Sequence, residues 1–167
     1  MFDFDLPEQG LYRTRRPMPG NETMFPSPVL VFIGDSKTPG AKFIVRPSNN
    51  RRNRWFWAEP ALALKPTDAH WARSLLRLPV EGFYTLPETI HLDGGGKWLK
   101  NAIVELGYNE RGQGIVFLAE WDENGEENVL TFSDHGVLVD DTMLMRLIWA
   151  PILPIRSKTL PPPPVLG

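Results

Sequence analysis

The chain of 167 residues contains no cysteine. It therefore cannot form disulfides, bind a metal through thiolates or use a cysteine nucleophile. It also has little that resembles a secretory signal, because its first ten residues, MFDFDLPEQG, are acidic and carry no apolar core. The longest apolar runs, at residues 28–33 and 143–153, are much shorter than a membrane-spanning helix. We therefore expect a soluble, cytoplasmic protein.

Long helical patterns are scarce as well, because 17 prolines and 14 glycines divide the chain into short segments. Residues 1–28 contain five prolines and show no clear period, which predicts an extended N-terminal arm over the surface. Residues 29–156 are predicted to form a single β-rich globular domain. Residues 157–167 contain four consecutive prolines, which predicts a polyproline II or disordered tail.

Several segments have the composition of strands. VLVFIGD from Val29 and AKFIVRP, which ends at Pro47, are rich in β-branched and aromatic residues and predict a hairpin. SNNRRNR then predicts a polar loop, and RWFWAEP predicts a strand with its two tryptophans on one face and Phe56 on the other. Residues 98–140 predict an antiparallel meander whose clearest turn is Asn124-Gly125. Within it, IVFLA predicts an inner strand covered on both sides.

Two segments favour helices. Thr67 or Asp68 can cap a helix through AHWARSLLRL that ends at Pro79. TMLMRLIWA, at residues 142–150, favours a second helix, with a buried strand as the alternative. The predicted fold class is therefore α+β and mostly β, with an antiparallel curved sheet or partial barrel and one or two short helices.

The charge is unevenly distributed: residues 1–80 carry +5, whereas residues 81–167 carry −7. Within the basic half, three arginines at residues 51–54 are followed at once by three aromatic residues at 55–57. Guanidinium groups pair with phosphates and aromatic rings stack on bases, so this pattern suits single-stranded nucleic acid. The alternative is a solvated turn followed by core aromatics. The candidate binding residues are Arg51, Arg52, Arg54, Trp55 and Trp57.

A glycine run forms a second candidate site. The backbone amides of Gly94, Gly95 and Gly96 could form an anion nest beside Lys97. A phosphate-binding P-loop is not predicted, because Trp98 stands where that motif needs a hydroxyl. A flexible turn between strands is the alternative reading.

No catalytic residue, metal site or cofactor is assigned. His70, His91 and His135 have no metal-binding spacing, and four carboxylates fall in or beside predicted strands without forming a motif: Glu59, Glu88, Glu105 and Glu120. We favour a non-enzymatic protein-binding or assembly domain whose partner is a protein or a second copy of the chain, rather than nucleic acid or a membrane. The alternatives are a small hydrolase-like enzyme that uses scattered carboxylate and histidine residues, and a single-stranded nucleic-acid-binding module built on residues 51–57.

Overall fold

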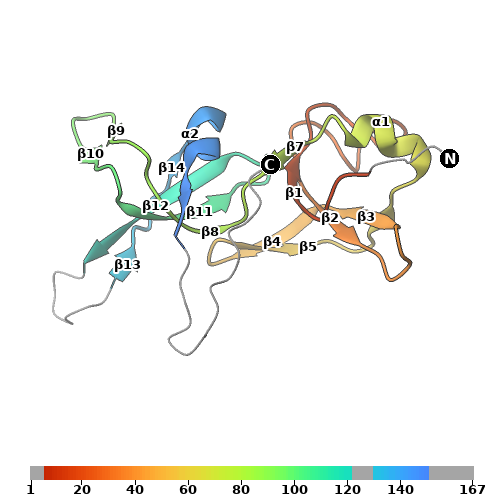
Figure 1. The fold of residues 1–167 in the computed structure, drawn as a ribbon, viewed down its shortest axis with the longest axis horizontal. Coiled ribbons are helices and arrows are strands. Elements are labelled where there is room, and N and C mark those ends of the chain that lie inside the picture. The colour runs from red at the N-terminus through yellow and green to blue at the C-terminus, as the bar shows by residue number, and fades with distance from the viewer. Residues whose placement is uncertain (1–5, 122–129, 151–167) are drawn as a thin grey trace. The chain divides into compact units, whose positions relative to one another are not determined.

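The structure is a computed structural model that describes residues 6–121 and 130–150 (Figure 1). It is mostly β, with antiparallel sheets and two short helices, so the predicted α+β class is confirmed. Across these residues, no helix has the length and apolar character that a membrane crossing requires.

The described residues group into two compact units. The first unit comprises residues up to Val80 together with Tyr108–Gln113, and the second comprises Glu81–Gly107 and the residues from Gly114 onward. The prediction of one globular domain over residues 29–156 stays a prediction.

The first unit is built on a five-stranded antiparallel sheet with the strand order β6-β3-β2-β1-β7. Alternation along β2 and β3 sends Ile33 and its partner Ile44 to one face, and Phe32 and its partner Val45 to the other. Both faces contain fully or partly buried apolar side chains, which is why these strands are rich in β-branched and aromatic residues. The strands are β1 (Gly10–Arg13), β2 (Leu30–Asp35), β3 (Lys42–Val45), β6 (Leu62–Ala63) and β7 (Leu76–Leu78).

One helical segment contributes to the core of the first unit. The 3-10 turn η1 (Pro66–Asp68) leads directly into α1 (Ala69–Ala72). Trp71 of α1 is buried, and its indole Nε1 donates a hydrogen bond to the carbonyl of Arg16 over 2.9 Å. Trp71 therefore ties the helix to the N-terminal segment while filling the core with Tyr12, Met18, Phe25, Val31, Ile33 and Ile44.

A separate two-stranded hairpin, β4 (Pro47–Arg51) and β5 (Arg54–Trp57), completes the first unit (Figure 1). The predicted loop over SNNRRNR is therefore wrong, because residues 47–51 extend and pair with β5. The backbone hydrogen bonds of this pairing hold the segment in a strand, although its polar side chains do not indicate one.

The second unit contains a six-stranded antiparallel sheet with the order β13-β12-β11-β8-β15, in which β14 also pairs with β12. A small two-stranded sheet, β9 (Ile90–His91) with β10 (Lys97–Trp98), is formed by the residues between β8 and β11. The strands of the larger sheet are β8 (Gly82–Thr85), β11 (Ile103–Tyr108), β12 (Gly114–Trp121), β13 (Leu130–Phe132), β14 (Val137–Leu138) and β15 (Ile148–Trp149).

The helix α2 (Asp141–Arg146) covers one face of this sheet. A β-carbon built on Gly114 would lie 2.9 Å from Cδ1 of Leu144 and 3.5 Å from Cδ1 of Leu106, so the glycine permits the close approach. Asp140 caps the helix, because its Oδ1 accepts a hydrogen bond from the amide of Met143 over 2.7 Å. The helix-covered face carries the fully buried side chains Tyr84, Val104, Leu106 and Val116.

The N-terminal segment is the largest correction to the predictions. Residues 10–13 form β1, which lies between β2 and β7 in the sheet, and Met18 and Phe25 are buried in the core. The prediction of a surface arm is therefore wrong for residues 6–28. Its prolines lie outside β1, in the irregular segments that flank this strand, and composition alone did not reveal the buried positions among them.

The predicted helix from residue 69 to residue 78 is also wrong beyond Ala72. Leu76–Leu78 form β7, which pairs with β1 through Leu78 opposite Leu11 and Leu76 opposite Arg13. A strand partner far away in sequence thus outweighs the local helical spacing.

The predicted hairpin near residues 29–47 is confirmed, and the C-terminal meander is confirmed in part. The hairpin of β2 with β3 and the antiparallel run β11-β12-β13 are present, but β14 pairs with β12 rather than β13. β12 is an inner strand, although only Val116 among its five central residues is fully buried. Residues 142–150 contain both elements considered: helix to Arg146, then strand β15. The Asn124-Gly125 turn and the 157–167 tail lie outside the described residues.

Candidate functional site

The β4–β5 hairpin positions the predicted basic site. Its register places Arg51 opposite Arg54, Asn50 opposite Trp55 and Asn49 opposite Phe56. Directly opposed residues of antiparallel strands share a face, and faces alternate along each strand. One face of the hairpin therefore carries Asn49, Arg51, Arg54 and Phe56. We call these residues, together with Arg52 at the turn, the basic face.

The two tryptophans point to the other side and anchor the hairpin to the first unit. The ring of Trp57 stacks on Phe32 of β2, with centroids 5.4 Å apart and an interplanar angle of 29°. The indole Nε1 of Trp55 donates a hydrogen bond to the carbonyl of Tyr108 over 2.8 Å. The opposite orientation of the tryptophans and Phe56 is thus confirmed. The structure keeps Arg51, Arg52 and Arg54 together but separates Trp55 and Trp57 from them.

Phe56 is the aromatic residue that the basic face presents to solvent. It is 51% exposed, which is unusual for a side chain of this size. The guanidinium carbon of Arg51 lies 5.9 Å from the ring centroid, within the range of a cation–π contact. Phe56 was absent from the predicted site residues, because the alternation of the strand places it opposite the two tryptophans but does not show which of the two faces is exposed.

The hairpin turn has an unusual backbone. Arg52 and Asn53 have φ angles of 51° and 61°, and the two-residue turn between Arg51 and Arg54 follows the positive-φ pattern of type I′. Glycine or asparagine normally occupies such positions, and an arginine there is held in a less favourable conformation. The turn places a third guanidinium at the tip of the hairpin.

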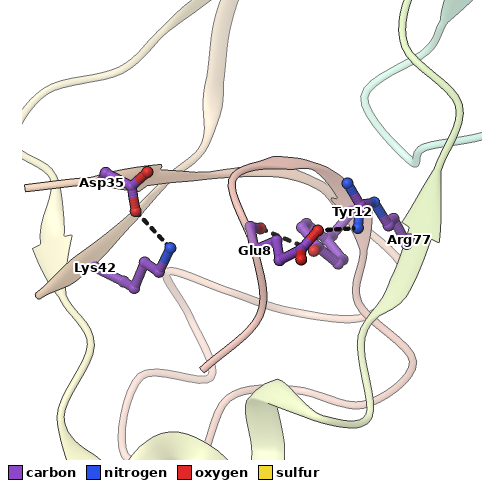
Figure 2. Close-up of polar contacts among 5 residues, drawn as sticks. All are labelled: Glu8, Tyr12, Asp35, Lys42 and Arg77. Carbon is purple, nitrogen blue, oxygen red and sulfur yellow. Dashed lines mark hydrogen bonds and ion pairs between the residues drawn. The ribbon is translucent and has the colours of Figure 1, made fainter. Parts of the chain in front are cut away.

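The basic face lies in a strongly basic unit. The described residues of the first unit contain thirteen arginines and lysines against six aspartates and glutamates, a balance of +7. Some of these cations have partners: Lys42 pairs with Asp35, and Nη1 of Arg77 lies 2.7 Å from Oε2 of Glu8 (Figure 2). By contrast, no carboxylate among the described residues forms an ion pair with an arginine of the basic face.

The contacts in Figure 2 also show how the paired cations act structurally. The hydroxyl of Tyr12 donates a hydrogen bond to the carbonyl of Glu8 over 2.8 Å, beside the Arg77–Glu8 ion pair. Burial raises the pKa of Tyr12, while the charge of Arg77 acts in the opposite direction. Arg77 therefore stabilises the N-terminal segment against β7 and is not available to a ligand in the way the hairpin arginines are.

The glycine run forms the turn between β9 and β10. Gly94 and Gly95 have φ angles of 97° and 96°, which only glycine adopts readily. The amide of Gly95 donates to the carbonyl of Leu92 over 3.2 Å, and the amide of Leu92 donates to the carbonyl of Gly96 over 2.8 Å. Because the Gly95 amide is engaged inside the turn, the loop offers fewer free donors than a nest requires. The anion nest of Gly94, Gly95, Gly96 and Lys97 stays a prediction.

The histidines do not assemble with carboxylates. His70 lies on α1 in the first unit, and His91 and His135 are exposed residues of the second unit. Within residues 6–121 and 130–150, no group of three or more His, Asp or Glu side chains is arranged to hold a metal ion.

The six-stranded sheet of the second unit has an exposed apolar face opposite α2. Ile148 and Ile103 both lie opposite Thr85, so the three share this face, and the ring of Phe83 lies 5.3 Å from that of Phe132. Ile103, Leu130, Leu138 and Ile148 are each at least 40% exposed. We call Phe83, Ile103, Leu130, Phe132, Leu138 and Ile148 the outer face. Local sequence patterns did not reveal this face, because its residues come from five strands.

Compared with protein-family models, with curated proteins and with solved structures, the chain matches none.

Proposed function

We propose that this chain is a non-enzymatic binding protein whose basic face holds an anionic partner. One observation carries the proposal: the three arginines of the hairpin are exposed, lie together and have no ion-pair partner among the described residues. Surface cations that serve only solubility are usually dispersed or paired with nearby carboxylates, as Lys42 and Arg77 are.

The chemistry of arginine and the charge of the first unit support the same conclusion. A guanidinium group presents a planar fork of donors that matches phosphate, sulfate and carboxylate oxygens. The balance of +7 in the first unit adds a long-range field that draws anions towards it. The two anchored tryptophans hold the hairpin in one position, so less conformational entropy is lost on binding.

The test uses retention of the full chain on immobilised heparin, with elution by increasing salt. We compare a triple variant, Arg51→Gln, Arg52→Gln and Arg54→Gln, with a control triple variant of the same net charge. The control changes Arg15, Arg73 and Arg111, which are exposed arginines elsewhere in the first unit. We expect the hairpin variant to elute at much lower salt than the control variant. Equal elution of the two variants would show that retention depends on net charge alone and would overturn the proposal.

The outer face of the second unit favours a second candidate function, which is self-association with another copy of the chain. Contiguous exposed apolar residues are uncommon on monomers and typical of interfaces. A contact between two identical outer faces would bury apolar side chains of one copy against those of the other. Glu105 lies opposite Phe83 and therefore adds one acidic side chain to this face.

Light scattering over a range of protein concentrations tests this second candidate. The double variant Ile103→Lys and Ile148→Lys places charges on the two strands that flank β8 in the outer face. The matched control is Leu99→Lys with Met145→Lys, because it adds the same two charges at exposed apolar side chains that lie outside the outer face. We expect a concentration-dependent mass that the double variant abolishes and the control retains. A monomeric wild-type chain at every concentration would rule out self-association.

A further inference from the structure

We propose that the anionic partner of the basic face is single-stranded nucleic acid, bound with a base stacked on Phe56. This inference rests on the proposed function, because it names the partner of the same face. It requires more than charge: the face must offer both cations for phosphates and a free aromatic surface for a base.

The exposed ring of Phe56 is the first part of the argument. The ring shares its face of the hairpin with Arg51 and Arg54 and is 51% exposed even with Arg51 beside it. A base and a guanidinium plane both stack on aromatic rings, so Arg51 and a base can pack around Phe56 together. An anionic partner without flat rings, such as an acidic peptide, would leave this apolar surface unused.

The pairing of Arg51 with Arg54 is the second part. The two residues lie directly opposite each other across the hairpin. Like charges in this position repel and weaken a two-stranded sheet. Phosphates of a bound strand lying against the two guanidinium groups would offset this repulsion, so binding removes an unfavourable interaction in addition to forming favourable ones.

The turn residue Arg52 is the third part. Its φ of 51° would suit glycine better, yet an arginine is present and extends the row of cations to the tip of the hairpin. A backbone strained at one position is a reason to look for a use of that side chain. Three guanidinium groups along one short ribbon match successive phosphates of a strand.

Double-stranded DNA is the main competing nucleic acid, because its major groove admits a two-stranded β-ribbon. Within a duplex, however, the bases are stacked on one another and present only their edges. Phe56 would then have no base surface to contact. Unpaired bases are therefore the ligand that uses every feature of the face.

The experiment measures fluorescence anisotropy of labelled oligonucleotides with the full chain at several salt concentrations. The probes are oligo(dT) of about 12 nucleotides, an abasic strand of equal length and a duplex of equal length. We expect oligo(dT) to bind more tightly than both other probes. Its log affinity should fall with log salt at a slope of roughly −2, as expected for about three phosphate contacts with a single strand.

Variants separate the contributions of the ring and the charges. Phe56→Leu should weaken oligo(dT) binding roughly five- to hundredfold and leave the abasic strand unaffected, whereas Phe56→Trp should retain the affinity. Arg52→Gly should reduce the steepness of the salt dependence by about 0.7, because one phosphate contact is lost. Its free energy of unfolding should be equal to or greater than that of the wild-type chain, because glycine suits the turn. Arg73→Gln is the control for the loss of one positive charge. It should change the affinity for oligo(dT) and the salt slope less than Arg52→Gly does.

The possible outcomes distinguish this inference from the proposed function. Equal binding of oligo(dT) and the abasic strand, tighter binding of the duplex, or an unchanged affinity in Phe56→Leu would overturn the stacking inference. Heparin retention that still depends on Arg51, Arg52 and Arg54 would then leave the proposed function standing. Polyglutamate that competes with heparin more effectively than oligo(dT) would assign the face to an acidic protein instead.

Discussion

Thr14 offers the sharpest test of how the first unit is held together. Its side chain is only 1% exposed, and it is the buried polar residue among the described core positions. The hydroxyl donates a hydrogen bond to the carbonyl of Pro26 over 2.6 Å and accepts one from the amide of Val29 over 2.9 Å. One oxygen thus joins the end of β1 to the segment that enters β2.

Replacing Thr14 with valine removes that oxygen while keeping the shape of the side chain. Val29 is itself buried, so its amide would lose its partner where water does not reach it. Leaving a buried donor or acceptor unsatisfied costs about 1–3 kcal/mol. Pro26 is half-buried, so its carbonyl should recover part of its loss. We expect Thr14→Val to lower the free energy of unfolding by about 2–4 kcal/mol, a large part of the total for an ordinary domain.

Urea unfolding followed by tryptophan fluorescence measures this effect, since Trp71 lies buried in the same core. Thr14→Ser is the control: it keeps the hydroxyl and loses one buried methyl group, worth about 1 kcal/mol. The valine variant should therefore be less stable than the serine variant, although valine fills more space. If serine destabilises more than valine, packing rather than hydrogen bonding maintains this corner and the reasoning is wrong.

Three further perturbations test other parts of the fold. Gly34→Ala should destabilise the first unit by about 1–3 kcal/mol in urea unfolding, because the new β-carbon would overlap the ring of Phe43; no loss would mean that the ring moves freely. Asp140→Ala should cost about 0.5–2 kcal/mol by removing the cap on the amide of Met143, and Asp140→Ser should recover most of it; equal melting temperatures for all three proteins would refute the cap. Burial raises the pKa of Tyr84, so the folded state disfavours the phenolate, and unfolding free energy should decline as pH rises above about 10, the value in the unfolded chain. The free energy of unfolding of Tyr84→Phe, measured across that pH range, should decline less steeply than that of the wild-type chain. An identical decline would show that Tyr84 does not cause the pH dependence.

The sequence predicted those parts of the fold that depend on local patterns. β2 and β3 follow from two β-branched runs separated by a short turn, and the long strand β12 follows from an uninterrupted apolar run. Each of these elements pairs with a close neighbour along the chain. Their formation can therefore be inferred from composition and turn residues alone.

The errors share one physical origin. β1 and β7 pair with each other across more than sixty residues, and neither has a strong local strand signal. Once residues 10–13 are taken for a surface arm, residues 76–78 have no visible partner and the helical spacing that begins at Trp71 predominates. Both mistakes concern one long-range ladder, which local periodicity does not encode.

The candidate site was predicted only in part, because some of its features are local and others depend on long-range contacts. The arginines and the alternation of Trp55, Phe56 and Trp57 are local features, and the structure agrees with the alternation. Which face is covered depends on Phe32 and on the carbonyl of Tyr108, residues distant in sequence. The sequence therefore identified the segment but not the exposed aromatic residue within it.

The return of residues 108–113 to the first unit has a practical consequence for dissecting this protein. The carbonyl of Glu110 accepts a hydrogen bond from the amide of the fully buried Leu30, and the carbonyl of Tyr108 holds the indole of Trp55. A fragment ending at Val80 would lose both acceptors, so the first unit is discontinuous and cannot be excised by a single cut in the gene. Weak binding by such a fragment would reflect a missing piece of its own fold, which is why the basic face must be studied through point variants of the full-length chain.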